Sequence, residues 1–193
     1  AALAERGFFP KEDLVTLRKL GSYLQGHPNM NSVPGVDMST GSLGQGVSIA
    51  TGMALGAKTA KKNLHVYTLL GDGELQEGQV WEACTAAAHY GLDNLTVLID
   101  NNGLQIDGTN DEVMSLGNLR LRFEDVIELA DGNHLAAVLH ALDIPAMPGR
   151  PRCILAHTVK GCGVSFMENQ VGWHGKAPSS EELAAAFQEL EGE

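Results

Sequence analysis

The sequence has 193 residues, 44% of them hydrophobic, which suits one domain of ordinary size with its own core. Its 13 Lys and Arg against 24 Asp and Glu give a formal net charge of −11, which argues against a nucleic-acid backbone or an anionic membrane as the main partner. No apolar run approaches the roughly 20 residues that a membrane-spanning helix needs. We therefore expect a globular domain that binds neither nucleic acid nor membrane.

Short apolar runs alternate with helix-like segments along the chain. Continuous apolar runs are typical of strands in a parallel sheet that helices cover on both faces. This alternation predicts an α/β fold with a doubly wound, mostly parallel sheet flanked by helices. The expected elements, in chain order, are a helix over Leu43–Ala60, a strand over Leu64–Leu70, a helix over Gln79–Tyr90, strands over Leu95–Ile99 and Val126–Leu129, a helix over Leu135–Leu142, a strand over Cys153–Thr158, and a helix from Ser179 to Leu190 that opens with capping-box spacing.

Two stretches between these elements lack a clear period. Gly103–Leu119 is rich in Gly, Asp and Asn, and we expect a long loop there, which in a compact domain is often functional. Pro145–Pro151 is better interpreted as a loop before a strand than as a linker. We therefore predict a single domain over residues 1–193, and because the sequence opens on Ala1 without Met, we expect an upstream segment to be missing.

The three cysteines, Cys84, Cys153 and Cys162, show neither metal-binding nor redox spacing. We expect free thiols buried as small hydrophobic side chains. Free thiols are typical of a reducing compartment, so we expect a cytoplasmic protein.

An acid stands between two glycines where the strand over Leu64–Leu70 ends, in Gly71-Asp72-Gly73. Ligands in open α/β sheets gather beyond the carboxyl ends of the strands. A carboxylate there is a hard oxygen ligand that suits Mg²⁺, and Gly73 offers an unhindered N–H to a phosphate oxygen. On its own, however, this tripeptide is more often a strand-to-helix turn in which the acid caps the helix.

A second polar residue changes this balance. Asn102 stands 30 positions after Asp72 and also follows an apolar strand. The right-handed crossover of a strand–helix–strand unit places both strand ends at the same edge of the sheet. We therefore predict that Asp72 and Asn102 bind one divalent cation, together with a nearby backbone carbonyl and phosphate oxygens.

Gly71-Asp72-Gly73 with Asn101-Asn102 resembles the thiamine-diphosphate motif, and the flanking motifs resemble those of the transketolase family. The resemblance runs from about Leu17 to Pro178. The motifs that carry it, in chain order, are Gly26-His27-Pro28, Pro34-Gly35-Val36, the run from Thr40 to Gly46, the run from Gly71 to Gly78, Ile106-Asp107-Gly108 and Trp173-His174-Gly175.

The resemblance implies a role for each matching residue. Asp72 and Asn102 would bind Mg²⁺, or Ca²⁺ or Mn²⁺ in its place, through side-chain oxygens, and Leu104 would bind it through its backbone carbonyl. Gly73 would donate its N–H to the diphosphate, and His174 would lie near the diphosphate and the substrate.

Other matching positions would contact the rest of the cofactor, the substrate or the partner. His27 would hydrogen-bond substrate hydroxyls, and Glu77 would reach an acid across the subunit interface. Ile106 would pack on the thiazolium, and the loop of Gly41, Ser42 and Leu43 would line the aminopyrimidine ring. The resemblance thus implies catalytic roles for His27, His174 and Glu77, and cofactor contacts for Gly41, Ser42, Leu43, Gly71, Asp72, Gly73, Asn102, Ile106 and His174.

The chain departs from the family pattern in two respects. Ser42 stands where many family members have Pro. The family's Ser-Gly-His-x-Gly and Gly-His-Ala segments precede the point that Ala1 matches. Five of the seven histidines fall in or beside predicted helices and strands, where structural or surface roles are more common: His65, His89, His134, His140 and His157.

The resemblance covers only the diphosphate-binding half of a transketolase. It implies a transferase that moves a two-carbon ketol unit between sugar phosphates together with a carboxy-terminal transketolase subunit that carries the pyrimidine-binding domain. We expect a dimer of halves or a heterotetramer. Two alternatives stay open: a component of another thiamine-diphosphate enzyme, of the deoxyxylulose-phosphate synthase or 2-oxoacid dehydrogenase type, and a non-catalytic subunit that binds Mg²⁺ and phosphate.

Overall fold

A computed structural model describes residues 1–191 of the chain. It divides into two compact units, Ala1–Gly46 and Val47–Glu193, and each is described by itself. That residues 1–193 act as a single diphosphate-binding domain stays a prediction. Within the described residues, no helix has both the length and the apolar character that crossing a membrane requires.

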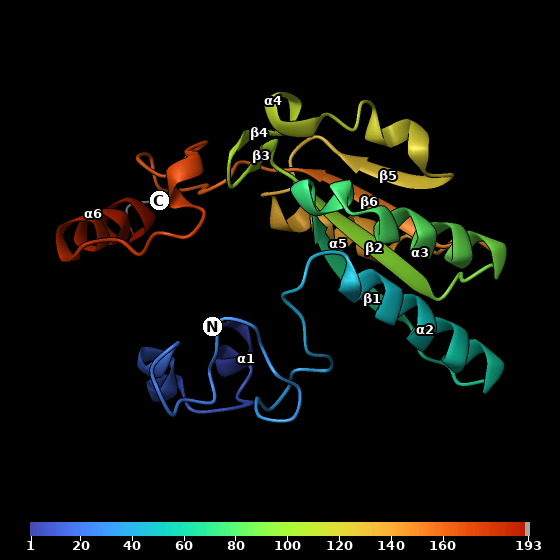
Figure 1. Cartoon of the computed structure of the whole chain (residues 1–193), viewed down its shortest axis with the longest axis horizontal. Helices are drawn as coiled ribbons and strands as arrows, with labels where there is room; N and C mark the ends of the chain where they lie inside the picture. The colour runs from blue at the N-terminus through green and yellow to red at the C-terminus, as the bar shows by residue number, and fades with distance from the viewer. Residues whose placement is uncertain (192–193) are drawn as a thin grey trace. The chain divides into compact units, whose positions relative to one another are not determined.

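The second unit is built on a four-stranded parallel sheet (Figure 1). Its strands lie in the order β1-β2-β6-β5, and every neighbouring pair is parallel. The strand bounds are β1 Val66–Gly71, β2 Leu95–Asn101, β5 Asp125–Leu129 and β6 Arg152–His157. All four predicted strands are present, with ends that differ by one or two residues, and the predicted parallel sheet is confirmed.

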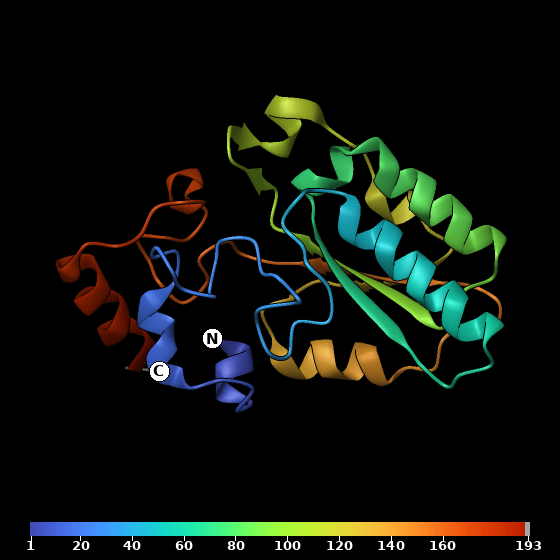
Figure 2. The same ribbon diagram turned by 60° about the horizontal axis from the view of Figure 1, so that its bottom comes forward.

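Helices cover both faces of this sheet, as predicted (Figure 2). α2 (Gln45–Thr59) and α3 (Gly78–His89) lie on one face, and α5 (Leu135–Asp143) lies on the other. The first face packs a continuous core of helix and strand residues, among them Ala54, Leu70, Val80, Val97 and Ile99. Ile154 of β6 and Ala141 of α5 are also fully buried and stand outside that core cluster.

The prediction of a single loop over Gly103–Leu119 was wrong. β3 (Leu104–Gln105) pairs antiparallel with β4 (Gly108–Thr109), and α4 (Asn110–Met114) follows directly. A 3-10 turn, η3 (Leu119–Arg122), closes the segment. These elements are too short to produce a readable period, although the Thr109-to-Glu112 spacing is that of the capping box that starts α4.

Shorter elements complete the two units. The first unit contains α1 (Ala2–Glu5) and η1 (Lys11–Thr16) around a small core of Ala4, Phe9, Leu24 and Val33. In the second unit, η2 (Gly73–Gln76) follows β1, η4 (Val171–Trp173) precedes His174, and α6 covers Ser180–Glu191. The expected capping box of α6 is confirmed, because Ser179 and Glu182 exchange side-chain-to-backbone hydrogen bonds.

Candidate functional site

Asp72 directly follows β1, and its carboxylate is inside the protein. The residue is 3% exposed. Its Oδ1 accepts a hydrogen bond from Gly73 N at 2.8 Å, and its Oδ2 accepts one from Gly103 N at 2.5 Å. Asp72 is also the N-cap of η2, as the capping alternative predicts, and its bond from Gly73 N is the capping bond, whereas the bond from Gly103 N is outside that alternative.

The buried Asp72 carboxylate has no cationic side chain paired with it within residues 1–191. None of the ion pairs in that part of the chain includes Asp72. Buried charges are normally paired or bound to a metal, and each carboxylate oxygen keeps a lone pair beyond the one that its N–H partner uses. Asp72 therefore has both the need and the capacity to bind a cation.

The structure brings Asn102 to the same place. Gly103, which donates to the Asp72 carboxylate, directly follows Asn102 in the chain. Asn102 Oδ1 accepts a hydrogen bond from Leu104 N at 3.0 Å, and its Nδ2 donates to Asp100 Oδ1 at 3.2 Å. The two predicted metal ligands thus lie at adjacent ends of neighbouring strands, as the crossover rule predicts.

These donors fit magnesium better than a transition metal. The described residues contain no group of three or more His, Cys, Asp or Glu side chains that could hold a metal ion. The donors that the resemblance assigns to a cation beside Asp72 are instead one carboxylate, the Asn102 amide oxygen and the Leu104 backbone carbonyl. Mg²⁺ is typically held by one or two carboxylates together with phosphate oxygens and water.

Of the two glycines that flank Asp72, Gly71 has open space beside its Cα and Gly73 does not. A Cβ atom on Gly71 would meet nothing within 4 Å, whereas a Cβ atom on Gly73 would lie 3.0 Å from Gln105 Cβ. The Gly73 N–H, which the resemblance assigns to the diphosphate, donates to Asp72 Oδ1 here. Ile106 lies in the turn between β3 and β4 and is 64% exposed, so its side chain is free to contact a ligand.

A cavity of about 180 Å³ opens beside Asp72. It is lined by the strand-end residues Asp72, Asn101 and Gly103 and by the capped start of α4. Glu77, five residues after Asp72, is the N-cap residue of α3. It is exposed and its side chain makes no capping hydrogen bond, so its carboxylate is available to a partner. Its assignment to a subunit interface stays a prediction.

His174 is exposed and lies beside a lysine that the sequence analysis did not identify. Lys160 Nζ is 3.4 Å from His174 Nδ1. Because an ammonium group can only donate, Nδ1 accepts, and the proton of the neutral ring is on Nε2. In the described part of the chain, no hydrogen bond or ring contact joins His174 to Asp72 or Asn102.

The remaining predicted site residues belong to the first unit. Gly41 has a φ of +123°, and a Cβ atom there would overlap Cγ of the His27 ring. Thr40 N donates to Pro28 O at 3.4 Å, so the two predicted motifs meet within this unit. Residues adjoining this contact are exposed, namely Ser42 and Leu43.

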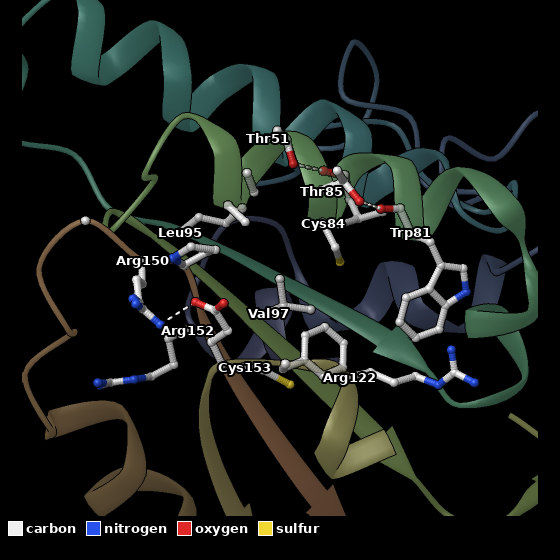
Figure 3. A pocket seen from close by; sticks show the side chains of 17 residues that line it. Thr51, Trp81, Cys84, Thr85, Leu95, Val97, Arg122, Arg150, Arg152 and Cys153 are labelled. Carbon is white, nitrogen blue, oxygen red and sulfur yellow. Dashed lines mark hydrogen bonds and ion pairs between the residues drawn. The ribbon is translucent and has the colours of Figure 1, made fainter. Parts of the chain in front are cut away.

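A larger cavity of about 560 Å³ lies elsewhere in the second unit (Figure 3). It lies between the core-facing sides of α2 and α3 and the amino-terminal ends of β2 and β6. Arg122 stacks 5.0 Å from the Trp81 ring centroid, and the Phe123 and Trp81 centroids are 5.9 Å apart. None of the predicted site residues lines this cavity.

Two cysteines line the larger cavity, and all three are free. Burial raises the pKa of the Cys84 thiol to about 11 and that of Cys153 to about 12, which makes both poor nucleophiles. The expectation of three buried thiols is confirmed for Cys153, whereas Cys84 is partly buried and Cys162 is exposed. Cys162 lies in the loop that follows β6, outside the sheet that buries Cys153.

The chain is similar to known proteins over nearly its whole length. Residues 6–192 match the family model described as the transketolase thiamine diphosphate binding domain. The chain is 41% identical to an apulose-4-phosphate transketolase subunit of Phocaeicola vulgatus, over 97% of this chain and 68% of that protein. It is 40% identical to the 6-deoxy-6-sulfo-D-fructose transketolase subunit SqwG of a Clostridium species, over 100% of this chain and 72% of that protein.

The fold also matches the solved structure of a transketolase. The crystal structure of the Campylobacter jejuni enzyme superposes with a TM-score of 0.87 and 32% identity, over 93% of this chain. The match spans 30% of that enzyme's chain, so this chain corresponds to less than a third of it. The chain belongs to the family of transketolase thiamine-diphosphate-binding domains.

Proposed function

We propose that this chain is the diphosphate-binding subunit of a two-subunit transketolase. With a partner it would transfer a two-carbon ketol unit from a ketose phosphate to an aldose phosphate. The observation that carries the proposal is the buried Asp72 carboxylate, which pairs with no cationic side chain of the described residues and is hydrogen-bonded to the residue after Asn102. The similarity to two transketolase subunits over nearly the whole chain supports it.

Each group at the strand ends has a role in holding the cofactor. Asp72, Asn102 and the Leu104 carbonyl would hold Mg²⁺, which in turn would bind the diphosphate. When bound, thiamine diphosphate supplies a nucleophilic carbon that attacks a carbonyl and stores the electron pair of the broken C–C bond. The open side of Gly71 would leave room for the diphosphate.

We assign a substrate contact to His174 and one to His27. With Nδ1 of a neutral ring accepting from Lys160, His174 would present Nε2–H as a donor to a substrate hydroxyl or an anion. Gly41 supports the His27 ring from one side, because the absent Cβ lets the ring lie against the backbone. His27 would hydrogen-bond the hydroxyls of the sugar.

The partner would carry the pyrimidine-binding domain, as a carboxy-terminal transketolase subunit. Two of the relatives are named as transketolase subunits, which supports a two-chain enzyme. The exposed Glu77 carboxylate would face this partner. A dimer of such halves, or a heterotetramer, would assemble the complete site between chains.

The names of the relatives also suggest a substrate class. One is named for apulose 4-phosphate and another for 6-deoxy-6-sulfo-D-fructose. Phosphate and sulfonate are both anionic groups at the end of a sugar. We therefore propose a ketose donor with a terminal anion, with pentose phosphates as the first substrates to assay.

Cofactor binding is the first test of this proposal. Melting temperatures of the chain would be measured with and without Mg²⁺ plus thiamine diphosphate, alone and with its partner. A ligand at 100 times its Kd should stabilise the parent by about 2.7 kcal/mol. Asp72→Asn should abolish the rise, whereas Asp143→Asn, which makes the same change at the exposed end of α5, should keep it. An unchanged rise in Asp72→Asn would refute the metal assignment.

Turnover is the second test. The chain and its partner together should transfer a ketol unit from xylulose 5-phosphate to ribose 5-phosphate, and the chain alone should not. A complex that binds the cofactor but turns over no phosphorylated or sulfonated ketose would favour a non-catalytic binding subunit.

A further inference from the structure

The residues that follow β2 and β6 share one hydrogen-bond network. Thr158, the first residue after β6, donates its hydroxyl to Asp100 Oδ1. Asn102 Nδ2 donates to the same oxygen at 3.2 Å. Thr158 N also donates to Asn101 O at 3.3 Å, so backbone and side chain of Thr158 both hold the end of β2.

This network fixes which end of the Asn102 amide faces the cation site. The two ends of a carboxamide have nearly the same shape, but one end donates and the other accepts. A carboxylate can only accept, so Asp100 selects the Nδ2 end of Asn102. The Oδ1 end is therefore directed away from Asp100, where Leu104 N donates to it. Only Oδ1 can bind a metal ion.

We propose that Thr158 and Asp100 are positioning residues that present the Asn102 amide oxygen to the metal ion. The inference rests on the proposed function, because it assumes that Asn102 is a metal ligand. Thr158 holds the Asp100 carboxylate in place, and Asp100 orients the ligand. Partners of metal ligands act in this way elsewhere, and their loss typically weakens metal binding by about 10- to 100-fold.

A second set of hydrogen bonds at the same strand ends can be compared with the bonds among Thr158, Asp100 and Asn102. His157 Nε2 donates to Glu128 Oε1 at 2.8 Å, and Asn101 Nδ2 donates to His157 Nδ1 at 3.1 Å. The side chains of His157 and Glu128 are 43% and 42% exposed, whereas the bond from Thr158 to Asp100 is partly buried. Water competes for the hydrogen bond between the exposed side chains of His157 and Glu128. Asn101, which these residues hold, is also not a predicted metal ligand. His157→Ala should therefore affect metal binding less than a change at Thr158.

The test measures metal affinity and needs no turnover. Mn²⁺ would be titrated into the full chain at saturating thiamine diphosphate and followed by electron paramagnetic resonance. Thr158→Val, which removes the hydroxyl at nearly constant shape, should weaken Mn²⁺ binding by about 10-fold. Thr158→Ser, which restores the hydroxyl, should bind like the parent, and the melting temperatures without ligands should stay equal.

A second variant acts on the other member of the pair. In Asp100→Asn the new side chain can present an NH₂ group to Asn102, so the Asn102 amide can rotate by 180°. We expect Mn²⁺ affinity to fall at least as much as in Thr158→Val. Asp100→Asn keeps the test decisive if Thr158→Val folds poorly.

The outcomes separate this inference from the proposed function. Parent-like Mn²⁺ binding in Thr158→Val, or a loss in Thr158→Ser as large as in Thr158→Val, would overturn the positioning role while cofactor binding by the parent stands. A parent chain that binds no Mn²⁺ even with thiamine diphosphate and its partner would overturn the proposed function and this inference with it.

Discussion

The two ends of the parallel sheet differ in whether a buried charged side chain is paired with a side chain of opposite charge. At the amino-terminal end, Arg152 is 5% exposed and donates to Asp125 and to the carbonyls of Ile144 and Pro145. At the carboxyl end, Asp72 is 3% exposed and accepts two backbone N–H groups, with no cationic side chain from residues 1–191 paired with it. Arg152 and Asp72 are thus about equally buried. The charge of Arg152 is saturated, meaning that it is paired with a carboxylate and donates to two carbonyls, whereas the charge of Asp72 has no ion-pair partner among the described residues.

This difference identifies the ligand-binding end better than cavity size does. The cavity of about 560 Å³ lies at the end where Arg152 is saturated, and the cavity of about 180 Å³ lies beside Asp72. A large cavity whose polar groups already bind one another offers a ligand little beyond apolar contact. Polar atoms with spare bonding capacity at the carboxyl ends of strands are typical of sites in open α/β sheets.

The first prediction tests the saturated end. Arg152→Leu should lower the free energy of unfolding by about 3 to 5 kcal/mol, because it leaves the Asp125 carboxylate without a cation, with only the hydrogen bond from Met147 N, and removes the donors to two carbonyls inside the protein. Urea denaturation would measure the loss. The rise in melting temperature caused by Mg²⁺ and thiamine diphosphate should survive in whatever fraction folds.

A double variant serves as the control for this prediction. Arg152→Leu combined with Asp125→Leu removes both charges and should recover part of the lost stability. Loss of the cofactor response in Arg152→Leu at temperatures where it is folded would contradict the separation between the two ends.

Much of this contrast could be predicted from the sequence, because its signals are local. Continuous apolar runs gave all four strands, and the glycines beside Asp72 marked the end of β1. The crossover rule then placed Asp72 and Asn102 at one edge, because β1 and β2 are consecutive and adjacent. Glycine, acid and amide at successive strand ends thus carry enough information to find the candidate metal site.

The contacts that support the site could not be predicted in the same way. Thr158 reaches Asp100 because β6 lies between β2 and β5, and nothing local in the sequence gives that strand order. Lys160 reaches His174 across a loop with no periodic pattern. Such contacts depend on sheet order and register, which are tertiary properties.

The second prediction extends the comparison to the first unit, whose described residues form no sheet to support the predicted site residues. Gly41→Ala should lower the free energy of unfolding by about 1 to 3 kcal/mol, because the φ of +123° disfavours a side chain and the new Cβ would overlap the His27 ring. Gly52→Ala is the matched control. Gly52 is inside α2, and a Cβ atom there would meet nothing within 4 Å, so alanine should stabilise the chain by about 0.8 to 1.0 kcal/mol.

Equal stabilities for the two glycine variants, measured by urea denaturation, would show that the contact between Gly41 and His27 does not constrain the loop. A parent-like stability of Gly41→Ala with lost turnover would place the effect in the orientation of His27 instead.

The third prediction concerns the wall of the smaller cavity. Thr109 Oγ1 accepts a hydrogen bond from Glu112 N and donates one to Glu112 Oε2, and these bonds start α4. Thr109→Ala should destabilise this segment by about 1 kcal/mol, the usual effect of removing such a cap. Amide hydrogen exchange across α4 should speed up accordingly, and Thr109→Ser should exchange like the parent. Identical exchange in the alanine and serine variants would mean that the cap does not hold this wall.

The last and smallest effect returns to the amino-terminal end of the sheet. Asp93 accepts hydrogen bonds from Lys58 Nζ at 2.9 Å and Gly149 N at 2.8 Å, and these bonds lower the pKa of Asp93 below its usual 3.8. Because the folded pKa lies below the unfolded value, Asp93 stabilises the fold above about pH 4, and this contribution is lost as the pH falls through the folded pKa. The pair is partly exposed, so we expect less than about 1 kcal/mol.

Urea denaturation of the parent and Asp93→Asn at pH 7 and pH 3 should show a difference in stability that shrinks in acid. Lys58→Met should show the same trend, because the Lys58 hydrogen bond is the largest cause of the lowered pKa. A difference in stability that stays constant between the two pH values would contradict the prediction that the hydrogen-bonded Asp93 carboxylate stabilises this end of the sheet.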